Sequence, residues 1–192
     1  MHHIFHTEGF VLGSKNYREA DKYYYILTRD FGLIYASAQG IRKISSKLRF
    51  VLQDFAYIRV DLVRGRDFWR ITTASKTNLL EFVINPIALG ITANISKLLR
   101  RLLAGEEANE KLFMDLVSGF SVLEKAKDKK EAHNIETIIV LRILNNLGYI
   151  GEGKISDEFI LSPFEGDLIF QASENRNKIL REINKALKET HL

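Results

Sequence analysis

The hydrophobic period of this 192-residue chain changes once, close to Pro86, and that change limits the folds open to it. Before it, short runs rich in β-branched and aromatic residues are separated by glycines or polar clusters, a pattern typical of strands. After it, large apolar residues recur at i, i+3, i+4 and i+7, a pattern typical of amphipathic helices. We therefore expect an α+β protein, with a strand-built domain over residues 1–80 and a helical domain over residues 81–192.

The first domain contains five strand-like runs. With a longer connection between the third and the fourth, these runs cover residues 7–12, 22–28, 33–38, 53–63 and 68–74. Five strands in about 75 residues is the element count of an OB-fold, so we expect an N-terminal five-stranded OB-fold barrel.

The fourth run shows a period of two. Every second residue from Ala56 to Leu62 is apolar and suits a barrel interior, which leaves Phe55 and Tyr57 on the outward face together with charged residues. Outward aromatic rings beside charges are what a base-stacking platform needs, although a protein interface uses the same residue types. Phe55 and Tyr57 are therefore candidates for base stacking or partner contact.

The second domain is expected to be a helical bundle. Its helical periodicity covers residues 87–103, 109–124 and 131–147, and a final amphipathic helix covers residues 175–190. Asn85 followed by Pro86 is a helix start signal, and Gly148 stands where a left-handed C-cap is favoured. Similar lengths and short connections predict an antiparallel bundle. Between the last two helices, the short apolar runs around Pro163 and Gly166 suggest a hairpin or a pair of loops.

The residue types of this chain argue against most catalytic and metal chemistry. Cysteine is absent, which excludes disulfides, thiolate zinc sites, iron–sulfur clusters and a cysteine nucleophile. Residues 148–154 match the start of a phosphate-binding loop, but Ile155 replaces the magnesium-binding Ser or Thr and the motif follows a helix rather than a strand. We expect no catalytic residues, no metal and no cofactor, and therefore not an enzyme.

The sequence also suggests where the protein works. No apolar run reaches the length of a membrane span, and the first residues lack the pattern of a signal peptide. We expect a cytoplasmic protein without a membrane partner.

Positive charge is concentrated in the first domain. Residues 1–80 hold 13 basic against 7 acidic side chains, whereas residues 81–192 hold 15 against 17. Connections of an OB barrel line its binding groove, and cations there can neutralise nucleic-acid phosphates. This distribution favours nucleic acid over a merely solubilising rim, without separating DNA from RNA. Eight cations fall in three expected connections: Lys15, Arg18, Arg42, Lys43, Lys47, Arg49, Arg64 and Arg66.

Several ordered blocks resemble one family. Residues 8–12, 17–22, 27–32, 38–46 and 52–55 are similar to blocks of RecO, the bacterial recombination mediator family. The resemblance covers about the first 80 residues well. The helical part is similar in architecture, and the Leu-Gly-Tyr that ends at Tyr149 resembles the end of a leucine-rich helix in that family.

The resemblance implies a non-enzymatic protein of DNA repair that binds single- and double-stranded DNA and anneals complementary strands. With the partner RecR it would help load RecA onto strands coated by single-strand-binding protein. An alternative is an OB-fold scaffold that docks RecR or other repair proteins, with weak or no DNA binding of its own. By position, the DNA contact would be carried by Arg18, Arg42, Lys43, Lys47 and Arg49, whereas Lys15, Arg64 and Arg66 rest on their expected loop placement alone.

One departure from the family pattern is informative. Many RecO proteins carry a four-cysteine zinc element after that helix, and residues 162–170 resemble its second half, with Asp167 for a glycine and Phe170 for a cysteine. We expect a short cysteine-free remnant of this hairpin near residues 155–172, where Ile160, Leu168 and Phe170 replace the metal by apolar packing. In so short a chain we also expect a reduced surface for single-strand-binding protein.

Overall fold

The computed structural model describes residues 3–77, 85–151, 153 and 155–190. The chain divides into two compact units. The first comprises Met1–Glu81 and Ser96–Glu110, and the second comprises Phe82–Ile95 and Lys111–Leu192. The boundary expected between residues 80 and 81 lies outside the described residues and stays a prediction.

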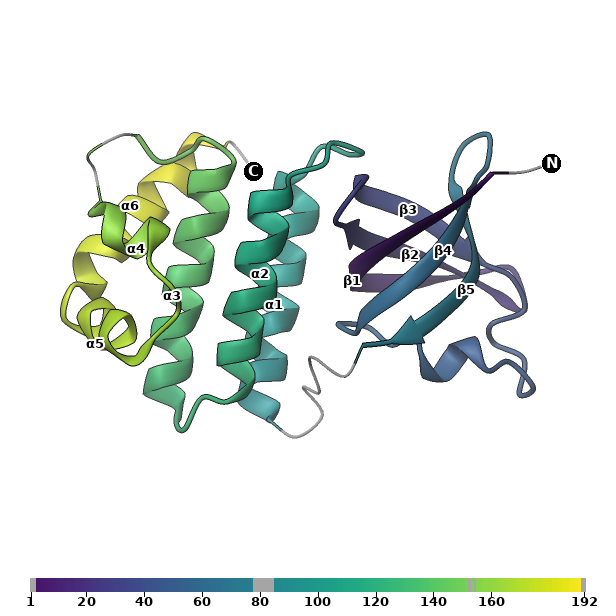
Figure 1. Cartoon of the computed structure of the whole chain (residues 1–192), viewed down its shortest axis with the longest axis horizontal. Helices are drawn as coiled ribbons and strands as arrows, with labels where there is room; N and C mark the ends of the chain where they lie inside the picture. The colour runs from purple at the N-terminus through teal and green to yellow at the C-terminus, as the bar shows by residue number, and fades with distance from the viewer. Residues whose placement is uncertain (1–2, 78–84, 152, 154, 191–192) are drawn as a thin grey trace. The chain divides into compact units, whose positions relative to one another are not determined.

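The strands of the first unit close into a barrel, which confirms the predicted five-stranded OB-like architecture (Figure 1). Around the barrel the order is β1-β2-β3-β5-β4, and every neighbouring pair is antiparallel except β3 with β5. The strands are β1 (Ile4–Tyr17), β2 (Asp21–Thr28), β3 (Gly32–Ala38), β4 (Tyr57–Arg64) and β5 (Trp69–Lys76).

Alternation along β4 fills the barrel as expected. Ile58 and Leu62 are buried in the core with Trp69. Tyr57 shares the outward face with Arg59, as expected, but it is only 4% exposed, so its ring is not open to solvent. The reason is tertiary: its ring stacks on Phe10 of β1 at a centroid distance of 4.8 Å. Phe55 precedes β4 in a turn, half-buried and with a φ of 71°, rather than on the face of a strand.

The long helices lie where the periodicity predicts them (Figure 1). The Asn85 Oδ1 atom accepts hydrogen bonds from the N–H groups of Ile87 and Ala88, at 3.1 and 3.2 Å, and so caps the first helix. Gly148, with a φ of 78°, follows the third helix in the left-handed conformation that favours glycine. The long helices are α1 (Pro86–Leu102), α2 (Glu110–Glu124), α3 (Lys129–Asn146) and α6 (Arg176–Glu189). No helix in the described ranges is both long and apolar enough to cross a membrane.

The hairpin expected near residues 155–172 is wrong. This segment instead forms two short helices, α4 (Asp157–Leu161) and α5 (Gly166–Glu174). Leu168 and Ala172 are four residues apart and both buried, so a helix places them on one packed face, and α5 lies against α3.

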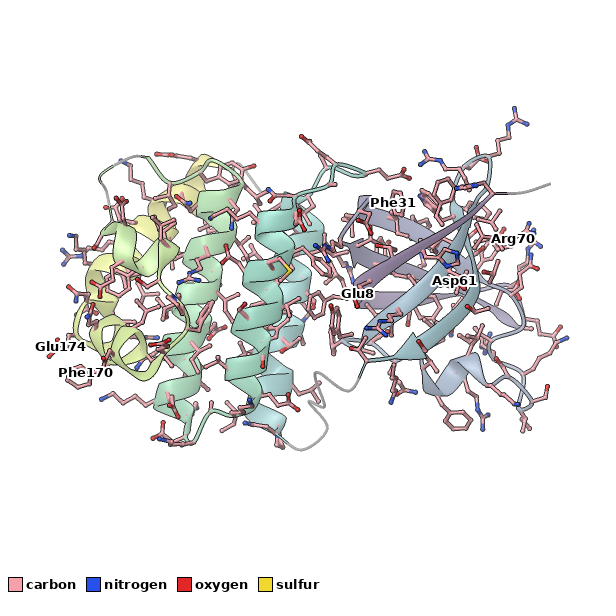
Figure 2. All side chains as sticks on the ribbon, viewed as in Figure 1. Glu8, Phe31, Asp61, Arg70, Phe170 and Glu174 are labelled. Atoms are coloured by element: carbon pink, nitrogen blue, oxygen red, sulfur yellow. The ribbon has the colours of Figure 1, made fainter. Side chains whose placement is uncertain are left out.

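The three apolar residues expected to pack in place of a metal differ in burial, and Ile160 is half-buried. Leu168 is buried, but Phe170 lies on the opposite face of α5 and is 65% exposed, so its predicted packing role is wrong (Figure 2). Without a cysteine, this segment does not fit the family's zinc element.

Candidate nucleic-acid interface

The connection from β3 to β4 carries the densest positive charge of the first unit. Residues 39–53, here called the basic segment, hold four cations and no acidic residue. Ile41 and Leu52 are buried, and Leu48 and Val51 pack against the barrel core. The segment is therefore an ordered part of the barrel surface rather than a free loop. Its cations are Arg42, Lys43, Lys47 and Arg49.

The basic segment is tied to the turn between β1 and β2. The Arg42 N–H donates to the Ala20 carbonyl at 3.0 Å, and the Arg42 guanidinium donates to the Glu19 carbonyl at 2.8 Å and to the Arg18 carbonyl at 3.3 Å. On the other side of the turn, Asp21 Oδ1 accepts the Gly40 N–H at 2.7 Å. These bonds hold Arg18 beside the segment.

Five of the eight predicted cations are thus brought together by the structure. Arg18, Arg42, Lys43 and Lys47 are exposed, whereas Arg49 is half-buried with its guanidinium over the ring of Phe50. A continuous surface of this kind can neutralise several phosphates of one strand.

The other three predicted cations differ in placement. Lys15 lies within β1, opposite Tyr23, and not in a loop. Arg64 ends β4 and is already paired with Glu106, with its guanidinium 4.8 Å from the centre of the Trp69 ring. Arg66 is exposed in the turn between β4 and β5. That turn lies at the opposite end of β1 from Arg18, because the first residue of β1 pairs with Val63.

Arg70 is an exposed cation that sequence reasoning did not single out. It alternates with the buried Trp69 and Ile71 on β5, and pairs with Ser37, one residue before β3 ends and the basic segment follows (Figure 2). In the part of the chain that the structure describes, its side chain has no ion-pair partner. Its outward direction could be read from the alternation, but the parallel pairing of β3 with β5 could not.

A second polar feature of the barrel is a groove of about 550 Å³ along β1, β4 and β5. Its carboxylates are already occupied: Asp61 contacts His6 at 2.6 Å and accepts the Thr73 hydroxyl at 2.7 Å. Acidic side chains balance the arginines that line it, so the groove does not suit a polyanion. Among the described residues, no group of three His, Cys, Asp or Glu could hold a metal ion.

Tyr57 is linked to this groove by a hydrogen bond to Glu8, one of the residues that line it. Its hydroxyl donates to Glu8 Oε2 at 2.8 Å, and Arg59 Nε donates to Glu8 Oε1 at 3.1 Å. The hydrogen bond from Tyr57, followed by the interactions with Arg59, holds the pKa of Glu8 below its ordinary value, while partial burial opposes the shift. Burial and the neighbouring Glu8 raise the pKa of Tyr57.

Replacing Tyr57 by phenylalanine should therefore make the free energy of unfolding fall less steeply as the pH is lowered. A carboxyl group whose pKa is lowered by folding stabilises the protein above its unfolded pKa, and this contribution is lost as the pH falls through the folded pKa. Tyr57→Phe keeps the stack on Phe10 but removes the hydrogen bond, so it should cost about 1 kcal/mol near neutral pH and less in acid. Urea unfolding at neutral and acid pH measures this difference. An equal loss at both pH values would contradict the assignment, and Glu8→Gln should remove the pH dependence of the Tyr57→Phe effect.

Two models of known protein families match this chain. Residues 1–79 match the family model described as Recombination protein O N terminal, and residues 85–152 match the one described as Recombination protein O C terminal. The chain belongs to the RecO family. Membership supports a role in the recombination branch of DNA repair.

Curated relatives carry the same family name. The chain is 27% identical to "DNA repair protein RecO" of Heliobacterium modesticaldum, over 78% of this chain and 53% of that protein. It is 25% identical to the protein of that name in Clostridium novyi, over 76% of this chain and 57% of the relative. A protein of that name in Dehalococcoides mccartyi is 32% identical, over 64% of this chain and 49% of the relative. The chain thus spans about half the length of the RecO relatives it matches.

Proposed function

We propose that this RecO-family chain is a recombination mediator that binds single- and double-stranded DNA and anneals complementary strands. The observation that carries the proposal is the basic segment, which is ordered by core packing and presents its cations without an intervening acid. The tie from Arg42 to the β1–β2 turn adds Arg18 to the same surface.

Contacts with phosphates explain how one surface can bind both single- and double-stranded DNA. Single strands and duplexes share the phosphate backbone, so a cationic surface without base-specific contacts binds both. Two strands held on such a surface repel one another less, since their phosphates are partly neutralised. Base pairing then supplies the free energy of annealing, and the reaction needs neither a catalytic residue nor a cofactor.

Membership of the RecO family supports the choice of partners. RecR would act with this protein to load RecA, and single-strand-binding protein would coat the strands on which they act. The work would take place in the cytoplasm.

An annealing assay tests the proposal. Two complementary oligonucleotides, one with a fluorophore and one with a quencher, are mixed with the protein without nucleotide or metal. We expect severalfold faster duplex formation, fading as the salt concentration rises from about 50 to 200 mM because released counterions drive binding. If there is neither acceleration nor binding at low salt, the mediator proposal is wrong. The alternative of a scaffold that docks RecR would then be tested by co-elution with purified RecR.

A further inference from the structure

Two large apolar side chains of the basic segment face solvent. Ile44 is 86% exposed and Phe50 is 58% exposed, although other apolar residues of the same short segment reach the barrel core. Single exposed apolar residues are common on protein surfaces and need no explanation. Here, however, both lie among four cations in a segment without an acidic residue, which is the composition of a surface that binds single strands.

The position of Phe50 is fixed by its surroundings. It ends the 3₁₀ turn η1 (Leu48–Phe50), its N–H donates to the Lys47 carbonyl at 3.3 Å, and Leu48 anchors the turn against the core. A ring held by a short hydrogen-bonded turn loses little freedom when a ligand stacks on it.

The guanidinium of Arg49 lies over the ring of Phe50. Its Cζ atom lies 4.5 Å from the centre of the Phe50 ring, while its Nε atom is buried and has no hydrogen-bond partner within the described residues. An arginine stacked on an aromatic ring is well placed to combine a phosphate contact with base stacking.

We propose that Phe50 stacks on an unpaired base of single-stranded DNA, with Ile44 as a second apolar base contact, while the surrounding cations hold the backbone. This inference rests on the proposed DNA binding and adds a preference to it. The bases of a duplex are stacked on one another and offer no open face to an aromatic ring, whereas an unpaired base does. Phe50 therefore strengthens binding to single strands and contributes little to duplex binding.

Phe50→Ala tests this preference directly. The probes are a fluorescein-labelled oligo(dT) strand and a labelled duplex of the same length, with binding followed by fluorescence anisotropy. We expect affinity for oligo(dT) to fall about tenfold, the order of one lost base stack, while duplex affinity stays within about twofold. The salt dependence should not change, since no cation is removed. Ile44→Ala should act in the same direction with a smaller effect, and Phe50→Trp should restore binding.

Phe170→Ala is the matched control, because Phe170 is similarly exposed but lies on α5 of the second unit. It should change neither affinity. The inference is overturned if Phe50→Ala binds oligo(dT) as tightly as the wild type, or loses strand and duplex binding equally. It is also overturned if the variant loses only co-elution with RecR, which would make Phe50 a protein contact. If the wild type binds neither probe, the proposed function itself fails, and that result is distinct from the others.

Discussion

Reversing the charges of Arg42 and Lys43 together, as Arg42→Glu/Lys43→Glu, is expected to lower DNA affinity on the order of 100-fold at low salt, because two phosphate contacts become two repulsions. The loss should be similar for every base sequence, since phosphates carry no sequence information. The slope of log affinity against log salt should also become shallower by about 1.4 for single strands. Anisotropy titrations at several salt concentrations measure both effects.

Arg42 needs a separate control, because its guanidinium also holds the β1–β2 turn. Lys43→Glu/Lys47→Glu changes the same charge without touching these bonds and should weaken binding comparably. Lys125→Glu/Lys127→Glu alters two exposed lysines of the second unit and should have a much smaller effect. Unchanged DNA affinity of the Arg42/Lys43 variant, or a loss of affinity that depends on base sequence, would contradict the assignment of the site to the basic segment.

Replacing Arg142 by methionine is expected to lower the free energy of unfolding by about 3–5 kcal/mol, the usual cost of removing one partner of a buried ion pair. Arg142 is only 4% exposed, and its guanidinium lies 4.3 Å from the centre of the Phe164 ring. It donates to the Phe159 carbonyl at 2.9 Å, to the Ser162 carbonyl, and to Asp115 at 3.3 Å. One side chain of α3 thus secures both α2 and the end of α4, and methionine fills its volume but leaves these acceptors without their donor.

Urea denaturation at neutral pH measures this loss, and hydrogen exchange around Phe159 locates it. Arg181→Met is the matched control, because Arg181 is exposed on α6 and should change stability by no more than about 0.5 kcal/mol. If the free energy of unfolding of Arg142→Met is within about 1 kcal/mol of the wild-type value, the buried arginine does not hold α4 in place.

The elements that could be predicted from the sequence are those with short-range causes. The period-two runs of the barrel and the i, i+3, i+4 pattern of the long helices are visible in a few residues. Asn85 before Pro86 and Gly148 after α3 mark helix ends because their own side chain or φ angle satisfies the local backbone. The short runs around Pro163 and Gly166 suit either a hairpin or helices, and packing against α3 selected the helices.

Some residues of the candidate site could be predicted from the sequence and others could not. The four cations of the basic segment are evident in the sequence, since charge without intervening acid needs no partner to be recognised. The stacking residue is not evident. Alternation pointed to Tyr57, which is on the outward face but is buried there, with its ring stacked on Phe10 and its hydroxyl bonded to Glu8. Phe50, in contrast, lies in a connection without a hydrophobic period.

The family, the five-stranded barrel, the long helices and the concentration of positive charge could all be predicted from the amino-acid sequence, because each is encoded in local pattern or in ordered blocks of residues. The three-dimensional structure was needed to show that Arg18 joins the basic segment, that Arg70 lies near its start, that Tyr57 is buried and that Phe50 is exposed. These outcomes depend on contacts between residues far apart in the chain. Strand order and the competition of side chains for core space select such contacts, and neither leaves a local signature.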